Sequence, residues 1–494
     1  MYAVMVLLLP MLAACGRSDG SSATSSESPQ PLSEAQPQPL SEAQPQPLSE
    51  AQRLGQWSPV SEAPIVQIHL HLLVSGKVMS WGGANGTPTY LWDPATGAFT
   101  AVPAPSDLFC GGHNFLPDGR LFVAGGHISD DHGLPNTNVF DPATETWQAL
   151  PPMPMARGRW YPTNTTLPNG EVVTMAGRDE NGDLVELPEV WNGAAWRQLT
   201  LAALELPYYP RNFVAPDGRI FYAGEEQQSR YLDVAVAGRW TDGPLRQFGL
   251  RDYGSAVMYE PGKILYAGGG DPPTDSAEII DLNQPSPTWT FTAKMAFARR
   301  QMNATLLPTG DVLVTGGTSG AGFNNAEGAV RAAELWHPAT GTWTTLASSA
   351  VVRMYHGTAL LLPDGRVLYT GSGRGPDGTA NERNYELYSP PYLFNGARPT
   401  ITGALPPRAG YGQTQVVNTP DGAGIAQVTL VGLGSVTHAF DQSARLVPLR
   451  FSRVATRLTI NLPASRTTAP PGPYMLFLVN ASGVPSVGRI MLLQ

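Results

Sequence analysis

The sequence predicts an all-β protein in which a seven-bladed β-propeller is followed by an immunoglobulin-like β-sandwich. Two observations carry this prediction. The chain contains 53 glycines and 47 prolines but only 14% charged residues, a composition that suits a protein dense in turns. In addition, a turn glycine followed by an apolar run recurs seven times between residues 69 and 394, and a repeat of this length indicates a propeller or another repeat architecture.

The seven turn glycines each open a strand of the predicted propeller, at residues 54–396. They are Gly76, Gly119, Gly170, Gly218, Gly262, Gly310 and Gly365. Their spacing of 43 to 55 residues is close to the roughly 50-residue period of kelch repeats. Most of the apolar runs end on a glycine pair, as at Gly125 and Gly126. A tight turn followed by an apolar strand is what a hairpin inside a blade requires.

The last predicted blade lacks its final aromatic residue, and an isolated strand near the other end of the propeller can replace it. Gln56-Trp57-Ser58 has the composition of such an outer strand. We therefore predict that this segment pairs with the seventh blade and closes the ring. From residue 397 to 494 the glycine pairs stop, and short apolar runs alternate with Gly/Pro turns. This pattern favours a small β-sandwich.

The first residues read as an export signal. An apolar run at residues 1–15 ends in Leu12-Ala13-Ala14-Cys15 and is too short to span a bilayer. This ending resembles a bacterial lipobox, which would make Cys15 a lipidated residue; ordinary cleavage near Ala14 is the alternative. Residues 16–53 are rich in Pro, Gln and Ser and repeat an octad, so we predict a disordered linker. The expected location is the bacterial cell envelope, as a lipoprotein, or the medium.

The net charge of the chain limits the classes of partner that it can bind. The net charge of −9 argues against nucleic acid, because binding to phosphates needs a positive field. The only membrane contact that we expect is through the lipid anchor. We expect a monomer that acts on a small molecule.

Four short stretches carry the candidate chemistry. They contain Cys110, Tyr161, the pair Tyr355-His356, and His438. The first three stretches lie seven or eight residues before the turn of their repeat, so blade symmetry should bring them to one mouth of the propeller channel. Two imidazoles and two phenols are a set that suits Cu(II). Each residue also has an ordinary structural interpretation, as a packed aromatic or a hydrogen-bonded histidine.

One difficulty concerns Tyr355 and His356, which are consecutive. Neighbouring side chains on a regular strand point to opposite faces. For both to reach one metal, the backbone must be irregular at this point, as at a strand start or a bulge.

At these residues the chain resembles the copper radical oxidase family that includes galactose oxidase and glyoxal oxidase. The stretches Arg159-Trp160-Tyr161-Pro162, Ser389-Pro390-Pro391-Tyr392 and residues 471–486 are closer to the glyoxal oxidase branch. The resemblance implies one copper ion held by Tyr161, Tyr355, His356 and His438. It also implies a Cys110–Tyr161 thioether that carries a radical, with Tyr355 as the base.

The activity implied by this resemblance is oxidation of small aldehydes or primary alcohols by O2, which yields H2O2. In the sugar-oxidising branch a tryptophan after the blade-three strand stacks over the cross-linked pair, whereas the loop at 177–182 has no aromatic residue here. We therefore expect no stacking ring and poor use of galactose. Tyr208 and Tyr209 are candidates to line the mouth, and His113 is the histidine expected near Cys110. The alternative is a non-catalytic exported propeller that binds a glycan or a protein.

The predicted anchor can be tested directly. Full-length protein made in a bacterium with two membranes should fractionate with the membranes, because lipidation of Cys15 buries acyl chains in the bilayer. Cys15→Ser should become soluble. As a control, Cys110→Ser removes the other cysteine and should leave the fractionation unchanged. Soluble wild-type protein without acyl groups in its mass spectrum would contradict the anchor.

Overall fold

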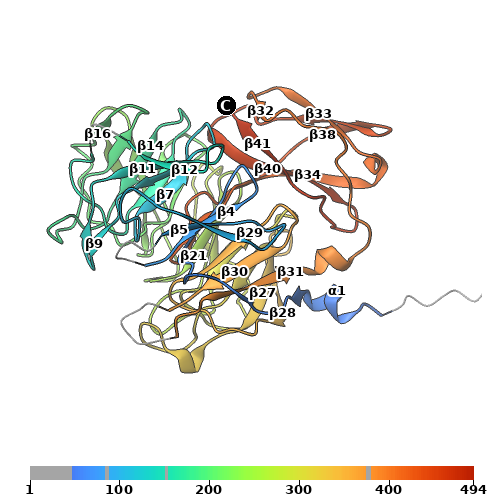
Figure 1. Cartoon of the computed structure of the whole chain (residues 1–494), viewed down its shortest axis with the longest axis horizontal. Coiled ribbons are helices and arrows are strands. Elements are labelled where there is room, and N and C mark those ends of the chain that lie inside the picture. Colours follow the sequence, from blue (N-terminus) through green and yellow to red (C-terminus); the bar gives the residue numbers. More distant parts are fainter. Residues whose placement is uncertain (1–46, 84–87, 151–153, 374–379) are drawn as a thin grey trace, which may run out of the picture. The chain divides into compact units, whose positions relative to one another are not determined.

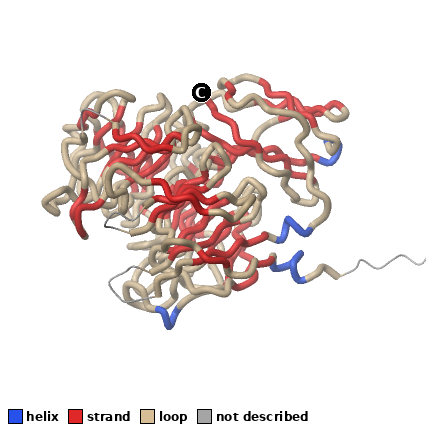
Figure 2. The backbone as a smooth tube through the Cα atoms, in the orientation of Figure 1, coloured by secondary structure: helices blue, strands red, loops and turns tan. Residues whose placement is uncertain are grey.

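The computed structural model describes residues 47–83, 88–150, 154–373 and 380–494. Within this range Leu48–Gln494 form one compact unit made of strands joined by turns, with few helical segments (Figure 2). The predicted signal peptide at residues 1–15, including Cys15, lies outside the described residues. No helix of the described part has the length and apolar character needed to cross a bilayer.

Seven antiparallel sheets follow one another along the chain, and each contains one of the seven turn glycines between its first two strands (Figure 1). The first three are blade 1, with β3 (His69–Leu72), β4 (Val78–Trp81), β5 (Thr89–Trp92) and β6 (Phe99–Val102); blade 2, with β7 (Gly112–Phe115), β8 (Leu121–Ala124), β11 (Thr137–Asp141) and β12 (Thr146–Ala149); and blade 3, with β13 (Thr163–Thr166), β14 (Val172–Met175), β15 (Glu189–Trp191) and β16 (Trp196–Gln198). A ribbon of β9 (His127–Ser129) and β10 (His132–Gly133) projects from blade 2.

The remaining four blades repeat this plan. Blade 4 has β17 (Asn212–Val214), β18 (Ile220–Tyr222), β19 (Gln228–Asp233) and β20 (Arg239–Leu245); blade 5 has β21 (Ser255–Glu260), β22 (Lys263–Ala267), β23 (Ala277–Asp281) and β24 (Thr290–Phe291); blade 6 has β25 (Asn303–Leu306), β26 (Val312–Thr315), the 3-10 helix η1 (Ala326–Gly328), β27 (Ala332–His337) and β28 (Thr342–Ser348); blade 7 has β29 (Gly357–Leu361), β30 (Val367–Gly371) and β31 (Asn384–Ser389). The predicted seven-bladed propeller is confirmed.

The N-terminal segment closes the ring as predicted. Strand β1 (Gln56–Trp57) pairs with β31 of blade 7, with Trp57 opposite Tyr388, and β2 (Ser61–Glu62) pairs further along the same strand. Trp57 also donates a hydrogen bond of 2.9 Å to the carbonyl of Ala347 in blade 6. The first and last parts of the propeller are therefore joined by main-chain hydrogen bonds.

A short helix, α1 (Glu50–Leu54), occupies the end of the segment expected to be a disordered linker. Ser49 and Gln52 form a reciprocal capping box at its start, which satisfies two backbone N–H groups. Tyr388 of blade 7 donates a 2.7 Å hydrogen bond to the carbonyl of Leu54. Local capping together with this contact orders the residues that composition alone assigned to the linker.

The C-terminal region forms two packed sheets, one with the order β32-β41-β40-β34-β37 and one with the order β33-β39-β38. After η2 (Pro391–Phe394) its elements are β32 (Arg408–Ala409), β33 (Thr414–Asn418), η3 (Gly422–Gly424), β34 (Ile425–Gly432), β37 (Leu446–Pro448), β38 (Phe451–Val454), β39 (Arg457–Asn461), β40 (Gly472–Asn480) and β41 (Arg489–Leu493). Alternate residues of the facing strands, such as Val417, Val428, Ile460 and Leu476, fill its core. This is the predicted β-sandwich.

A hairpin from the sandwich enters the propeller. Strands β35 (Ser435–Thr437) and β36 (Phe440–Asp441) extend the sheet of blade 1, with Val436 opposite Leu70 of β3. Directly after the hairpin, the side-chain oxygen of Gln442 accepts hydrogen bonds from the backbone N–H groups of His113 and Asn164. The hairpin is thus attached to three consecutive blades.

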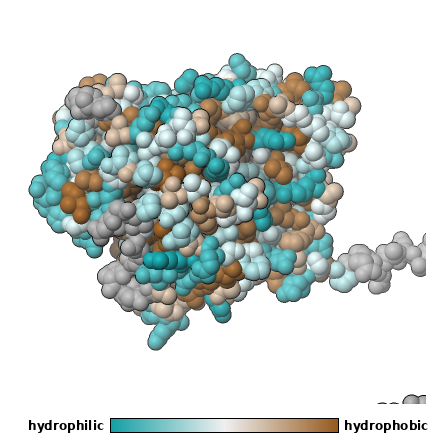
Figure 3. Space-filling view, in the orientation of Figure 1, coloured by the Kyte–Doolittle hydropathy of each residue, from teal (hydrophilic) through white to brown (hydrophobic). Residues whose placement is uncertain are grey.

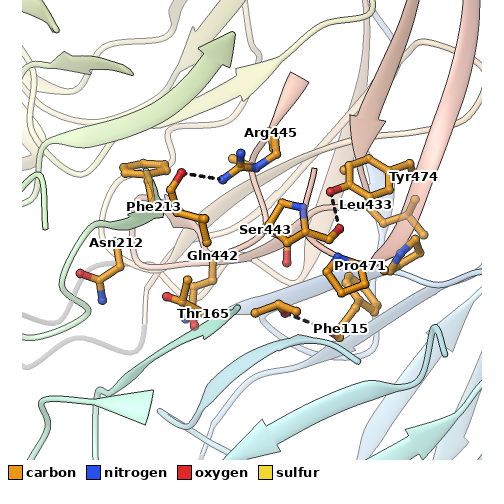
Figure 4. A pocket seen from close by; sticks show the side chains of 17 residues that line it. Phe115, Thr165, Asn212, Phe213, Leu433, Gln442, Ser443, Arg445, Pro471 and Tyr474 are labelled. Carbon is orange, nitrogen blue, oxygen red and sulfur yellow. Dashed lines mark hydrogen bonds between the residues drawn. The ribbon is translucent and has the colours of Figure 1, made fainter. Parts of the chain in front are cut away.

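Beside this hairpin lies a cavity of about 70 Å³. Figure 4 shows Thr165 and Asn212 of the propeller facing it together with Arg445 and Tyr474 of the sandwich. Arg445 donates to the carbonyl of Val214 across the boundary, at 3.3 Å. On the outer face seen in Figure 3, apolar residues are interspersed with polar ones, as is normal for scattered surface residues.

Buried arginine–glutamate pairs recur in the propeller. Arg159 pairs with Glu189 at 2.9 Å, Arg251 with Glu278 at 2.7 Å, Arg299 with Glu334 at 2.5 Å, and Arg353 with Glu386 at 3.6 Å. Each arginine also donates to a main-chain carbonyl at the end of the second strand of its blade, as Arg159 does to Ala176 and Arg353 to Gly371. The pairs therefore fasten the loops that enter blades 3, 5, 6 and 7 to the strands of those blades.

Loss of one partner should destabilise the protein strongly. Glu189→Leu leaves the Arg159 guanidinium buried without its carboxylate, and we expect the free energy of unfolding to fall by about 3–5 kcal/mol. Denaturant unfolding measures this change, and the double variant Arg159→Met/Glu189→Leu should recover part of the loss. Glu260→Leu, which removes an exposed pair with Lys263, serves as the control and should cost less than about 1 kcal/mol. Equal effects at the two sites would contradict a bracing role.

Candidate metal centre at the mouth of the propeller

The loops that enter blades 2 to 7 share an unusual backbone conformation. One residue just before the first strand of each has a positive φ: Cys110 (60°), Tyr161 (66°), Tyr209 (47°), Tyr253 (52°), Gln301 (59°) and His356 (65°). Residues other than glycine rarely adopt this region, and each such position costs of order 1–3 kcal/mol. This repeated conformation turns the chain at the same point before each of these six blades and places the six residues around one mouth of the propeller.

The tip of the inserted hairpin is strained in the same way. His438 and Ala439 have φ values of 45° and 63°, and they form the two-residue turn between β35 and β36. Such turns normally take glycine or asparagine because both central residues need positive φ. The strained turn delivers His438 into the ring of residues contributed by the blades.

Four of the predicted site residues meet here. The phenol oxygens of Tyr161 and Tyr355 are 2.5 Å apart, and Nε2 of His438 lies 2.8 Å from the Tyr161 oxygen. The His356 ring lies 4.6 Å from the His438 ring, centroid to centroid, and 3.8 Å from that of Tyr355. All four side chains are buried.

The irregular backbone expected at Tyr355 and His356 is present. The positive φ of His356 breaks the alternation of a regular strand before β29 begins. Two consecutive side chains therefore stack on one another, with an angle of 27° between their planes.

The hydrogen bonds of both histidines fix the nitrogen that faces the centre. Nδ1 of His356 lies 2.7 Å from the carbonyl of Gly373, which can only accept. Nδ1 of His438 lies 2.6 Å from the hydroxyl of Thr437, which itself donates to the carbonyl of Ile68. Both Nδ1 atoms therefore carry the proton, and each Nε2 keeps a lone pair, as in metal-binding histidines held by an outer partner.

The donor set fits a copper ion. Among the described residues, no three side chains drawn from His, Cys, Asp and Glu gather closely enough to hold a metal, so tyrosine oxygens must complete any site here. Two phenol oxygens and Nε2 of His438 converge with the His356 ring beside them, and nitrogen and oxygen donors are the ligation that Cu(II) favours.

Burial opposes ionisation of these groups. It raises the pKa of Tyr161 well above its usual value, and the nearby Cys110 and Tyr355 add to the effect. Burial also raises the pKa of Tyr355 and lowers that of His438, to which the neighbouring His356 contributes. Without a cation Tyr161, Tyr355 and His438 are therefore neutral, and a positive ion would favour the phenolate forms of the two tyrosines.

Cys110 lies beside Tyr161, as the repeat spacing predicted. It is fully buried, and it belongs with Tyr161 to a small apolar cluster that includes Phe109 and Trp160. Burial raises the pKa of the Cys110 thiol, although its hydrogen bond to Tyr161 opposes this shift. The main-chain N–H of Tyr161 donates to the carbonyl of Cys110 at 2.8 Å. The two residues that resemblance implies as a thioether pair are neighbours.

The expectation that no aromatic ring stacks on Tyr161 is wrong. The indole of Trp160 lies over the Tyr161 ring, with centroids 3.9 Å apart and planes inclined by 7°. The loop at 177–182 lacks an aromatic residue, but the preceding residue in the chain supplies one because the positive φ of Tyr161 folds its side chain back. Galactose is therefore not excluded by a missing platform.

The histidine that contacts Cys110 is also different from the one expected. His69, not His113, accepts the backbone N–H of Cys110, at 3.2 Å, and His113 contacts His69 in turn at 3.1 Å. Tyr253, which sequence reasoning did not select, hydrogen bonds with Tyr355. The repeated pattern Arg-x-Tyr, in Arg159-Trp160-Tyr161 and Arg251-Asp252-Tyr253, could have revealed it.

A pocket of about 490 Å³ opens onto Tyr161 and His438. As expected, Tyr208 and Tyr209 line it. Four carboxylates also line it, and they are Glu205, Glu225, Glu226 and Asp252. Of the two arginines in the lining, Arg178 lies 3.3 Å from Asp131. A small molecule can therefore reach the tyrosine–histidine centre through an acidic pocket.

Comparisons with known proteins agree with this geometry. Residues 270–392 match the family model described as glyoxal oxidase N-terminus, residues 398–493 match the galactose oxidase-like, Early set domain, and residues 116–154 match the kelch motif. A galactose oxidase from Gibberella zeae is 30% identical over 484 residues, covering 88% of this chain and 70% of that protein. The chain belongs to the copper radical oxidase family.

Two further relatives support this membership of the family. The aldehyde oxidase GLOX of Vitis pseudoreticulata is 32% identical over 435 residues, covering 78% of this chain and 81% of that protein. The solved structure of a fungal alcohol oxidase of the AA5 family, in complex with copper, superimposes with a TM-score of 0.82 at 26% identity and covers 90% of this chain and all of that one. The family of galactose oxidase and glyoxal oxidase that the sequence motifs suggested is confirmed.

Proposed function

We propose that this protein oxidises small aldehydes and primary alcohols with O2, releasing H2O2, at one copper ion held by Tyr161, Tyr355, His356 and His438. The observation that carries the proposal is the convergence of two phenol oxygens, Nε2 of His438 and the His356 ring beside Cys110. When bound, the ion would supply a one-electron oxidant and a Lewis acid for the substrate oxygen.

Tyr161 and Cys110 form the organic half of the cofactor in this proposal. A thioether to Cys110 would donate electron density to the Tyr161 ring and lower the potential of its phenoxyl radical. The Tyr161 radical would remove a hydrogen atom from the carbon that bears the substrate hydroxyl. Trp160, stacked at 3.9 Å, covers one face of the ring and keeps water away from it.

In this proposal Tyr355 is the base that accepts the hydroxyl proton of the substrate. The Tyr355 oxygen is 2.5 Å from that of Tyr161, so in the phenolate form, which a bound cation would favour, it could take the hydroxyl proton of a substrate bound beside Tyr161. Tyr253 hydrogen bonds with the same phenol, and the ring of Phe323 packs edge-on at 4.8 Å. These two neighbours hold the base in place. Loss of the hydrogen atom, the proton and one further electron converts an alcohol to an aldehyde, or an aldehyde hydrate to an acid.

A non-catalytic propeller that binds a glycan or a protein is the alternative function. A binding surface needs exposed polar groups, whereas the tyrosines and histidines here are buried and aimed at one another. The strain of four non-glycine residues at the centre has no role in such a scaffold. We therefore favour the oxidase.

We also propose that the protein is exported and held at a bacterial membrane through Cys15. The support is the apolar run that ends in Leu12-Ala13-Ala14-Cys15 and the Pro/Gln/Ser-rich segment after it. Simple secretion is the other possibility. Either location gives the enzyme direct access to O2 and to diffusible substrates.

The proposed oxidase activity depends on Tyr161 and Tyr355. Copper-loaded protein should release H2O2 from methylglyoxal or simple primary alcohols, as a peroxidase-coupled assay measures. Tyr161→Phe should abolish turnover because it removes the radical, and Tyr355→Phe should lower kcat by about 10²–10⁴-fold because it removes the base. The control Tyr411→Phe removes a phenol in the sandwich that donates to Ala469 and should keep wild-type activity. Fully copper-loaded wild-type protein that yields no peroxide from aldehydes, alcohols or sugars would favour the binding function.

The acidic pocket predicts a dependence on substrate charge and pH. Burial raises the pKa of Glu225 to about 7, although Arg211 opposes the shift. This carboxyl is therefore neutral below about pH 7 and anionic above it. Raising the pH from about 6 to about 8 should increase KM for the anion glyoxylate by roughly fivefold relative to methylglyoxal, which corresponds to about 1 kcal/mol of repulsion.

The variant Glu225→Gln should lose most of this pH dependence, because its side chain no longer ionises. Glu260→Gln, on a turn of blade 5 outside the pocket, should retain it. Steady-state kinetics on both substrates across the pH range would measure the effect. An unchanged pH dependence in Glu225→Gln would assign it to another group.

A further inference from the structure

Three histidines behind Cys110 form one buried network that the proposed chemistry does not use. His69 and His71 are alternate residues of β3, so their side chains lie on the same face of the strand. Both rings stack on Trp81, at centroid distances of 5.1 and 4.4 Å. Together with His113 of β7 they are fully buried.

The hydrogen bonds of this network converge on the Ser435 hydroxyl. Nε2 of His69 accepts from the backbone N–H of Cys110, so its proton is on Nδ1, which donates to Nε2 of His113 at 3.1 Å. Nδ1 of His113 then donates to the hydroxyl of Ser435 at 2.7 Å. Ser435 donates to the main-chain carbonyl of His113 and accepts from Nδ1 of His71 at 2.9 Å.

Burial keeps the histidines in this arrangement. It lowers the pKa of His69 and His71, and it lowers that of His113 to about 3. No histidine of the network can therefore pick up a proton near neutral pH and reverse a hydrogen bond. The network is a fixed connection between β3, the Cys110 loop and the sandwich hairpin.

The Cys110 loop is held from both sides. His69 accepts its N–H, and its carbonyl accepts the N–H of Tyr161. The indole of Trp81 donates to the carbonyl of Leu108, two residues earlier, at 3.1 Å. These bonds hold Cys110 at its positive φ of 60°, a conformation that a free loop would seldom adopt.

We propose that His69, fixed in its tautomer by His113, Ser435 and His71, is a positioning residue that holds the Cys110 backbone so that its sulfur can bond to the ring of Tyr161. The proposal rests on the proposed function, since it concerns how the Cys110–Tyr161 cofactor forms. In that step the S–H bond of Cys110 and one ring C–H bond of Tyr161 break and one S–C bond forms. The two electrons and two protons released reduce O2 to H2O2, with copper as the catalyst.

The test follows cross-link formation instead of turnover. Copper-free protein is mixed with Cu(II) and O2, samples are quenched over time, and intact mass reports the loss of two hydrogens while alkylation reports the remaining Cys110 thiol. His69→Leu removes the acceptor, and cross-linking should slow by about tenfold or more, because small misplacement of reacting groups has large kinetic effects. His69→Gln offers an amide oxygen near the position of Nε2 and should restore much of the rate.

A matched control and a second variant complete the design. His337→Leu removes a histidine on β27 that pairs with Asp311, far along the chain from the network, and should cross-link at the wild-type rate. Ser435→Ala removes one oxygen and should slow cross-linking in the same direction as His69→Leu. Circular dichroism verifies that each variant is folded, and if His69→Leu does not fold, the comparison uses Ser435→Ala and His69→Gln.

The outcomes separate this proposal from the proposed function. A wild-type rate in folded His69→Leu or, where that variant does not fold, in Ser435→Ala would overturn the positioning role while the oxidase remained. Equal slowing in His337→Leu would also overturn it. Wild-type protein that binds copper but never loses the two hydrogens would overturn both the thioether cofactor and the role of His69.

Discussion

The buried arginine–glutamate pairs are the interaction on which the rest of this molecule depends. The loops that enter the blades place their residues at the mouth of the propeller channel. Several of these residues have a positive φ, a conformation that costs free energy. The guanidinium of Arg159 lies two residues before Tyr161 and is bonded to Glu189 and to the carbonyls of Ala176 and Leu187. Because the charge is buried and paired with Glu189, the loop cannot relax without leaving an unpaired ion.

The repeated positive-φ position in the loops that enter the blades explains why different chemical groups lie at the same level of the propeller. The position that carries a positive φ is occupied by cysteine, tyrosine, glutamine or histidine according to the blade. The blades therefore supply geometry and the individual residues supply chemistry. Blade 1 takes no part in this ring of entering loops. In its place the sandwich contributes His438 through a hairpin that pairs with β3, so the centre is complete only when the two regions are assembled.

Burial sets the protonation state of the side chains at the centre. The phenols of Tyr161 and Tyr355 and the imidazole of His438 stay neutral in the absence of a cation, because they are buried among aromatic side chains such as Trp160 and Phe323. A bound cation changes that balance because it replaces the protons that burial keeps in place. The pocket above the centre is lined by carboxylates, so a neutral interior lies beneath an acidic entrance. This contrast separates the chemistry of the centre from the selection of substrates by charge.

The sequence by itself determined the periodic features of this protein. Turn glycines and apolar runs repeat within each blade, and local hydrogen bonding and burial act on every repeat in the same way, so the seven blades, the closing strand at Trp57 and the ring of Cys110, Tyr161 and His356 could be predicted. Tertiary structure decided which residues of this region touch. Trp160 stacks on Tyr161 because of one positive φ, and His69 replaces His113 beside Cys110 because β3 faces that loop. Neither contact has a sequence period, since each depends on how non-neighbouring segments pack and which of their hydrogen bonds can be satisfied together.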